Sequence, residues 1–328
     1  MGNLSFSLII IFSGLTFGYL IKQTVEAGLI RLPFSLASLT RVCRDVGIMG
    51  LIPTAFMLAI WVMEFGDNTL LALPFICLFA LMIGGALGYF LGVFKQRSNP
   101  DRAVLSVCSS FSNIGAMGSL VVYLFLGEAG FALVTFYRLF EEIFYFMVGY
   151  PAVELIAGKA HPKLRVGARL LRVLKQPFLI SILIAFALGL SLNLSDIQRP
   201  ALLDSANDLV IPLGTFVLLV SVGLGLNIKS IGQHLKPALQ VAALRVTLVP
   251  LLTVSLAWLV GLGDVSGGLA LGVILILTSM PPAVNSVVAT AYYGLNVDLA
   301  NSIWIVSTVS MVLVVPWLYF ATQYLQLG

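Results

Sequence analysis

The sequence contains very little charge. Only 10% of its 328 residues are Asp, Glu, Lys or Arg, whereas 59% are hydrophobic, and the mean hydropathy is +1.05. A soluble domain has about 25% charged residues, so this chain has too few charged groups to cover a surface that faces water. The composition therefore excludes a soluble globular enzyme, a disordered chain and a nucleic-acid-binding protein. Most of the surface is expected to face lipid.

Residues that commonly carry metal or nucleophilic chemistry are also scarce. The three cysteines, Cys43, Cys77 and Cys108, are far apart and form no CxxC pair, so they predict no metal or redox site. The two histidines, His161 and His234, lie in loops between apolar stretches, and HExxH and GxSxG motifs are absent. The sequence therefore predicts no enzymatic activity, no bound metal and no organic cofactor.

Long apolar stretches predict ten membrane spans, because about 20 apolar residues cross a bilayer as a helix. The fifth, 129–157, carries internal charges. The first is interpreted as a span rather than a signal peptide, because no basic residue precedes it and no clear cleavage site follows. The nine uncharged stretches are 2–21, 46–63, 70–94, 103–127, 178–195, 209–228, 246–263, 265–297 and 299–328.

The basic residues lie almost entirely on one side of this topology. Fifteen of the 18 Lys and Arg residues occupy alternate loops on one side, Arg199 lies on the other, and Arg138 and Arg245 lie within spans. Because Lys and Arg are enriched in cytoplasmic loops, the first side is expected to be cytoplasmic. We expect a multi-pass protein of a bacterial inner membrane with both termini outside the cytoplasm.

The most basic loop, residues 158–177, divides the spans into five and five. It contains six Lys or Arg residues and no acidic residue, and it connects a first repeat, 1–157, with a second, 178–328. An odd number of spans in each half inverts the second half relative to the first, as in many secondary transporters. The expected fold is an all-α membrane protein of two inverted five-helix repeats.

Matching spans of the two halves contain candidate interruptions. In span nine, Pro281 and Pro282 remove two backbone donors within an uncharged stretch, which breaks a helix or at least kinks it. In span four, the segment Ser109–Ser119 contains small polar residues and two glycines; close helix packing through Gly115 and Ser119 is the alternative. Interrupted helices in corresponding positions predict a transport site where the two segments cross.

At these residues the chain resembles the auxin efflux carrier family, which includes plant PIN-type carriers and bacterial organic-acid transporters. The resemblance covers nearly the whole chain and is most specific in the second half. It rests on Ser112–Gly118, on Met280–Ser286 followed by Tyr293-Gly294-Leu295, and on Pro212-Leu213-Gly214, Ala243-Leu244-Arg245 and Pro250-Leu251-Leu252. The chain differs from the family at Ser112 and Ser119, where proline is expected, and it lacks the long central domain of the plant carriers, as a bacterial-type member does.

The resemblance implies a fold that is also similar to that of bile acid–sodium symporters. Spans 1, 2, 6 and 7 would form a scaffold, and spans 3–5 and 8–10 a transport domain that moves against it in an elevator-type cycle. It further implies a homodimer in the lipid bilayer and a small organic anion, an auxin-like acid or a dicarboxylate, as substrate. Nucleic acid is not an expected partner.

The two crossover segments supply the candidate substrate-binding residues. The resemblance implies that Asn113 contacts the acid group of the substrate, and Asn285 is its counterpart in the inverted repeat. Capping of a broken helix is the alternative role for each asparagine. The candidate set is Ser112, Asn113, Gly115, Ser279, Pro281, Pro282 and Asn285.

Span five contains three charged residues, Arg138, Glu141 and Glu142, that are candidates for ion coupling. Charges within a span are costly and usually functional, and the spacing lets Arg138 pair with one carboxylate and leave the other for H⁺ or Na⁺. Alternatively, the cluster only fixes span five to its neighbours. For Arg245, in span eight, we expect snorkelling to the cytoplasmic interface.

Three functions are compatible with these features to different degrees. A secondary transporter of organic anions agrees best with repeat-related interruptions, and a sodium-coupled carrier like the bile acid symporters is a variant of it. A passive channel or a membrane sensor stays open as an alternative, because interrupted helices do not exclude a leak.

Overall fold

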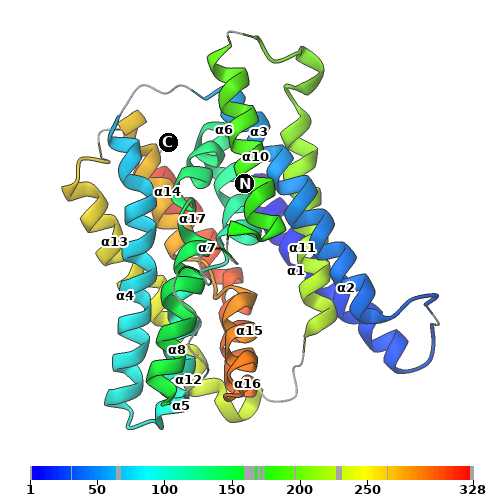
Figure 1. Cartoon of the computed structure of the whole chain (residues 1–328), viewed down its shortest axis with the longest axis vertical. Coiled ribbons are helices and arrows are strands. Elements are labelled where there is room, and N and C mark those ends of the chain that lie inside the picture. Colours follow the sequence, from blue (N-terminus) through cyan, green and yellow to red (C-terminus); the bar gives the residue numbers. More distant parts are fainter. Residues whose placement is uncertain are drawn as a thin grey trace. The chain divides into compact units, whose positions relative to one another are not determined.

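The computed structural model describes residues 2–30, 32–63, 68–158, 167, 171, 174–195, 197–226, 231–263 and 265–325. Over these residues the chain is helical, and the only β-type contact is one isolated bridge between Ser112 and Pro282 (Figure 1). The chain divides into two compact units, each described here by itself. The first comprises residues 1–66, 115–135 and 176–226, and the second comprises residues 67–114, 136–175 and 227–328.

The first unit is built around helix α11, which packs against α1, α2 and α3. Glycines bring α1 and α11 into backbone contact: a Cβ added at Gly18 would lie 2.2 Å from the Val220 carbonyl oxygen, and one at Gly223 would lie 2.3 Å from that of Leu15. Small residues at this interface allow the close approach that stabilises helix pairs in membranes. The helices are α1 (Gly2–Glu26), α2 (Leu36–Asp45), α3 (Ile52–Trp61), α6 (Ser119–Tyr137, whose last two residues belong to the second unit), α10 (Pro177–Leu194) and α11 (Ala206–Gly225), with shorter turns at Val46–Leu51, Ile114–Gly118 and Ala201–Leu203.

The second unit contains a similar glycine-mediated pair, α4 and α5. A Cβ at Gly84 would lie 2.5 Å from the Ser109 carbonyl oxygen, and one at Gly88 would lie 2.4 Å from that of Leu105. The helices are α4 (Leu73–Phe94), α5 (Asn99–Ser110), α7 (Glu141–Phe144), α8 (Tyr150–Ala157), α12 (Ile231–Val246), α13 (Leu248–Leu259), α14 (Leu269–Thr278), α15 (Val284–Tyr292), α16 (Val297–Val309) and α17 (Met311–Tyr324), with shorter turns at Asn68–Ala72, Tyr145–Gly149 and Val265–Gly268.

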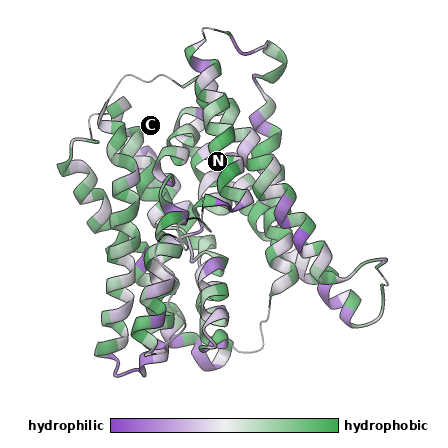
Figure 2. Cartoon of the chain, viewed as in Figure 1, coloured by the Kyte–Doolittle hydropathy of each residue, from purple (hydrophilic) through white to green (hydrophobic). Residues whose placement is uncertain are grey.

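The surface of the helices is apolar, as the composition predicts. Leu183, Ile184 and Leu188 of α10 are 41%, 54% and 51% exposed. Figure 2 shows hydrophobic residues along the helices and hydrophilic residues gathered at turns such as the one between α4 and α5. Exposed apolar side chains over this length are compatible with a hydrocarbon environment and not with water.

The number of helices long and apolar enough to span a membrane is smaller than the ten predicted spans. Within the described residues seven qualify, or eight when the bent pair α16 and α17 counts as one. The difference has a physical reason: α5 is followed by extended chain at Phe111, α14 and α15 are separated by Ser279–Ala283, and Ile114–Ala157 counts once although it contains the end of span four and all of span five. Most of the predicted basic connector, 158–177, lies outside the described residues.

Candidate functional site

Two helix interruptions meet inside the second unit. Helix α5 ends at Ser110 and is followed by extended backbone at Phe111, where φ is −72° and ψ is 123°. Helix α14 ends at Thr278, and α15 begins after Ala283, whose backbone is also extended. Both predicted segments are therefore interrupted, as Pro281 and Pro282 require in span nine and although span four has no proline.

The two interruptions pair with each other in antiparallel fashion. The Asn113 amide donates to the Pro281 carbonyl over 2.9 Å, and the Ala283 amide donates to the Phe111 carbonyl over 3.0 Å. Backbone groups freed from a helix at membrane depth need partners within the protein, because lipid offers none. Since proline cannot donate, Asn113 and Ala283 supply the amides on the two sides of this bridge.

Arg245 of α12 satisfies further backbone groups of the same crossover. Its side chain is buried, and its Nε donates to the Met280 carbonyl over 2.8 Å, while its Nη1 donates to the Ser109 carbonyl over 2.6 Å. Its Nη2 donates to Ser112 Oγ over 2.7 Å, and that hydroxyl donates to the Leu277 carbonyl over 2.9 Å. The expectation that Arg245 snorkels to the interface is therefore wrong.

The partners of Arg245 are all electrically neutral. They are two carbonyl groups and one hydroxyl group, and no described carboxylate lies within ion-pair distance of the guanidinium. Arginine stays protonated in proteins. The crossover therefore holds a buried positive charge without a matching negative side chain among the described residues.

Tyr145 connects this crossover with the charged residues of span five. The Ser112 amide donates to the Tyr145 hydroxyl over 3.3 Å, and this hydroxyl donates to Glu141 Oε1 over 2.7 Å. The second Glu141 oxygen lies 2.9 Å from Arg138 Nη2 in a buried ion pair. The Tyr145 ring also stacks on Phe111, with 3.9 Å between ring centroids. Span five is thus joined to the crossover by a chain of polar contacts.

The predicted coupling residues differ in their surroundings. Arg138 pairs with Glu141, as the three-residue spacing allows, and both side chains are buried. Glu142 is half-buried and makes neither a hydrogen bond nor an ion pair with another residue that the structure describes. Of the two carboxylates, Glu141 is therefore ion-paired, whereas Glu142 forms no ion pair within the described residues.

The predicted binding residues occupy several different positions. Ser112, Asn113, Pro281 and Pro282 lie at the crossover itself, and all four are buried. The remaining three are placed as follows: Ser279 donates its hydroxyl to Leu275 of its own helix (2.8 Å), Asn285 lies half-buried in the first turn of α15, and Gly115 belongs to the first unit, in the turn Ile114–Gly118.

Asn285 does not have the capping role that was its alternative. The residue at the N-cap of α15 is Ala283, which has no side-chain hydrogen bond to offer. Asn285 itself makes no side-chain hydrogen bond to the part of the chain that the structure describes. Its amide is therefore free to bind a solute, whereas the alternative roles of Asn113 stay open.

Sequence reasoning missed Arg245 and Tyr145 as parts of this site. Arg245 had a usable signal, because an ionisable residue within a span usually faces protein and marks a functional region. No sequence signal distinguished Tyr145, which is one of ten tyrosines. Its role follows from contact with Ser112, which is 33 residues away in the sequence.

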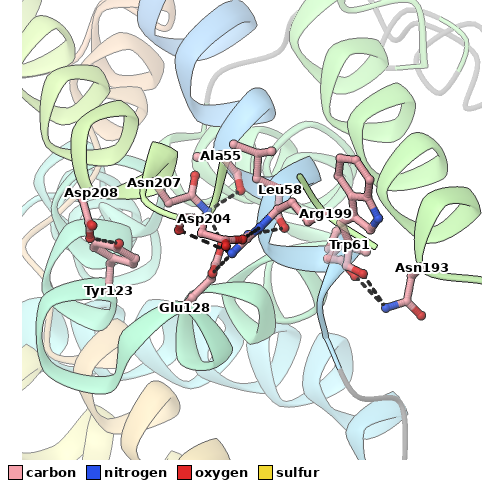
Figure 3. Close-up of polar contacts among 11 residues, drawn as sticks. Ala55, Leu58, Trp61, Tyr123, Glu128, Asn193, Arg199, Asp204, Asn207 and Asp208 are labelled. Carbon is pink, nitrogen blue, oxygen red and sulfur yellow. Dashed lines mark hydrogen bonds and ion pairs between the residues drawn. The ribbon is translucent and has the colours of Figure 1, made fainter. Parts of the chain in front are cut away.

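A third arginine, Arg199, whose side chain is 8% exposed, organises the first unit (Figure 3). Its Nη1 and Nη2 donate to the two carboxylate oxygens of Glu128 over 2.7 and 3.1 Å, and its Nε donates to Asp204 over 3.2 Å. Asn207 donates over 2.6 Å to Glu128 Oε1, the oxygen that also accepts from Arg199 Nη1. The hydrogen bond to Glu128 raises the pKa of Arg199. This cluster joins α3, α6 and the segment before α11 through neutralised charge.

Comparisons with known proteins agree with a membrane transport role. Residues 66–319 match the model of the family described as membrane transport protein. A protein of Methanothermobacter thermautotrophicus, described as an uncharacterized transporter, is 24% identical over 283 residues, which are 85% of this chain and 87% of that protein. Another uncharacterized transporter, from Methanocaldococcus jannaschii, is 27% identical over 253 residues, 75% of this chain and 78% of that protein.

Proposed function

Because the chain belongs to the membrane transport protein family, which is the family of the auxin efflux carriers, we propose that it is a secondary transporter of a small organic anion. This is a family of transporters and not of enzymes. The substrate in this proposal is a carboxylate, either an auxin-like acid or a dicarboxylate.

The feature that supports an anion most strongly is the charge of Arg245. The guanidinium is buried at the crossover and bonds only to neutral acceptors, so its positive charge is not cancelled by a described carboxylate. In a medium of low dielectric constant such a charge acts over several ångströms. It favours a bound anion and opposes a bound cation, while its donors stay occupied by the protein.

Asn113 and Asn285 provide the direct contacts of the proposed substrate. Neutral amides donate hydrogen bonds to a carboxylate without the strong binding of a second arginine, which allows release. Ser112, Pro281 and Pro282 shape the crossover next to them, and Ser279 and Gly115 complete the candidate set. The free Asn285 amide is the strongest support for this part of the proposal.

Coupling is assigned to Glu142, with Arg138 and Glu141 in a positioning role. Glu141 is held by Arg138 and by Tyr145, which leaves it little capacity to exchange an ion. Glu142 forms no hydrogen bond or ion pair within the described residues, although Arg138 and Glu141 are close enough to act on it electrostatically, and it can take up H⁺ or contribute to a Na⁺ site. An ionisable group in a span that forms no ion pair is a candidate carrier of this kind.

The proposed architecture is ten spans in two inverted repeats that operate as an elevator. It is supported by the division into two compact units: the first contains spans 1, 2 and 6 and span 7 as far as residue 226, and the second contains spans 3 and 8–10. Spans four and five contribute to both units, since 115–135 belongs to the first. The proposal also includes a homodimer in the cell membrane with both termini outside the cytoplasm.

Uptake into proteoliposomes tests this function. Purified protein should transport a labelled dicarboxylate or indole acid with saturable kinetics and with dependence on a proton or sodium gradient. Flux that rises linearly with concentration would indicate a passive channel, and binding without any flux would indicate a sensor. Arg245→Met and the charge-retaining Arg245→Lys, compared per folded molecule, test the role of the charge at the crossover.

A further inference from the structure

The second unit contains a lateral groove of about 580 Å³ that lies beside the crossover. Helix α5 packs against both α4 and α8 (Figure 1), and residues of all three helices line the groove. Lining residues extend along α5 from Asn99 to Ser110 and on to Phe111 at the interruption. Twelve helical residues correspond to a length of about 18 Å.

The groove is lined mostly by hydrocarbon surface, and the two α5 serines that line it offer no free hydroxyl. Ser106 Oγ donates to the Gly85 carbonyl over 2.9 Å, and Ser110 Oγ donates to the Leu81 carbonyl over 2.7 Å, so both hydroxyl groups are already used. The lining side chains Met82 and Phe90 of α4 are 52% and 53% exposed. Apart from Tyr89 and Asn99, the other lining side chains are apolar, so along most of the groove a polar solute would lose hydration without gaining hydrogen bonds, whereas an alkyl chain has no hydrogen bonds to lose.

Basic residues lie in the chain next to one end of the groove. Asn99 lines that end, and the turn between α4 and α5 next to it carries Lys95 and Arg97, with Lys95 exposed. Arg102 donates to Asn99 Oδ1 over 3.1 Å, and its Nε is buried without a hydrogen-bond partner in the structure. Figure 2 shows this turn as a hydrophilic end below the apolar helices. Basic pockets between spans favour anionic lipid headgroups.

We infer that this groove is a binding site for an anionic phospholipid, with an acyl chain along α5 and the headgroup at Lys95, Arg97 and Arg102. One wall of the groove is α4, which belongs to a helix long enough to span a membrane, Thr69–Phe94; the inner end of the groove is Phe111, and Phe111 stacks on Tyr145 of the polar chain that leads to the crossover. A bound chain therefore contacts the residue at which span four is interrupted. This inference does not depend on which solute the protein transports.

Native mass spectrometry of the full-length protein with phosphatidylglycerol or phosphatidylcholine of the same acyl chains tests it. Phosphatidylglycerol should be retained more strongly, and Lys95→Gln and Arg97→Gln should each weaken it by about fivefold. Arg41→Gln on α2, an exposed basic residue of the other unit, is the matched charge control and should leave retention unchanged. Equal retention of both lipids would overturn the inference.

Filling the groove from either wall gives an independent test. Ala86→Phe on α4 and Ala152→Phe on α8 should each abolish the retained phospholipid, while Ala187→Phe on the exposed face of α10 should not. Two filling variants guard against failure of one to fold. Wild-type phospholipid retention in both folded variants would contradict the site. If Ala86→Phe instead converted a dimer of the protein into monomers, a second copy of the chain and not a lipid would be the occupant of the groove.

Discussion

Arg199 in the first unit and Arg245 in the second both have side chains largely removed from solvent, but the surroundings of these two arginines are opposite. Arg199 in the first unit donates to Glu128 and Asp204, so its charge is neutralised by carboxylates. Arg245 in the second unit donates only to carbonyl and hydroxyl oxygens. Neutralised charge can only hold segments together, whereas Arg245 also leaves an electrostatic field at the crossover.

Energetics make the same distinction. A buried ion pair returns at best a small net stabilisation, but removal of one partner is costly because the other is left uncompensated. The guanidinium of Arg245 instead donates to carbonyl groups that have no helical partner where the helices are interrupted. Each buried polar group left without a hydrogen bond costs about 1–3 kcal/mol. The second unit therefore depends on Arg245 for both stability and charge, and the first depends on Arg199 for stability alone.

The largest effect is expected for Arg245→Met. The variant leaves the Ser109 and Met280 carbonyls and the Ser112 hydroxyl without their donor, so the free energy of unfolding should fall by about 3–5 kcal/mol. Anion uptake by the folded fraction should be lost. Thermal unfolding in detergent and proteoliposome uptake measure the two quantities.

Arg245→Lys separates charge from hydrogen bonding in this prediction. An ammonium group keeps the positive charge but cannot reproduce a planar fork toward three acceptors. The free energy of unfolding of Arg245→Lys should stay below that of the wild type, while its anion uptake should exceed that of Arg245→Met. Full uptake by a folded Arg245→Met variant would show that the charge has no role in binding and would remove the contrast with Arg199.

The next effect is expected at the Arg199 cluster. Glu128→Gln removes a bidentate ion pair whose arginine is 8% exposed and whose carboxylate is 23% exposed, so the free energy of unfolding should fall by about 2–3 kcal/mol. Uptake per folded molecule should stay at the wild-type level. A combined change, Arg199→Met with Glu128→Leu, should lose less stability than either single change.

Specific loss of transport in folded Glu128→Gln protein would contradict this second prediction. It would mean that the neutralised cluster takes part in the cycle and does not only join α3, α6 and the segment before α11. Asp204→Asn, which removes only the partner that is 59% exposed, is the mild control and should change stability by less than about 1 kcal/mol.

The parts of this picture that could be predicted from sequence are mainly the local ones. Two adjacent prolines interrupt a helix wherever they stand, and a three-residue spacing brings Arg138 to Glu141. The crossing of the two segments was also expected, from their corresponding positions in the two repeats. The part played by Arg245 could not be predicted, because it reaches Ser109 and Ser112, which are 136 and 133 residues away in the sequence. Snorkelling was the reasonable expectation for an arginine whose partners the sequence does not reveal, and burial overturned it.

The two glutamates of span five are expected to differ from each other. Glu141→Gln leaves the buried Arg138 without its counter-charge and weakens the contact to Tyr145, so the free energy of unfolding should fall by about 2–3 kcal/mol, as for Glu128→Gln, and uptake should fall in proportion to folded protein. Glu142→Gln breaks no described contact and should unfold like the wild type. It should nevertheless lose the response of uptake to pH or to sodium. Unchanged pH and sodium dependence at full activity would exclude Glu142 as the coupling group.

The smallest change in stability is expected for Asn285→Ala. The side chain neither caps α15 nor donates to a described residue, so the free energy of unfolding should change by less than about 0.5 kcal/mol. If the amide binds the substrate carboxylate, the apparent affinity for substrate should weaken by about tenfold, because a hydrogen bond to a charged group is worth about 1.5 kcal/mol or more. Concentration-dependent uptake and thermal unfolding, measured on the same preparation, separate the two effects.

Asn301→Ala on α16 is the matched control for this last prediction. Asn301 is half-buried in a helix of the same unit but lies outside both interruptions, so its removal should leave the affinity unchanged. An equal loss of affinity in both variants would indicate a general effect of removing a polar group from the membrane domain. Unchanged substrate affinity in Asn285→Ala would show that Asn285 has no part in binding. The charge of Arg245 and the amide of Asn113 would then be the groups that select the anion.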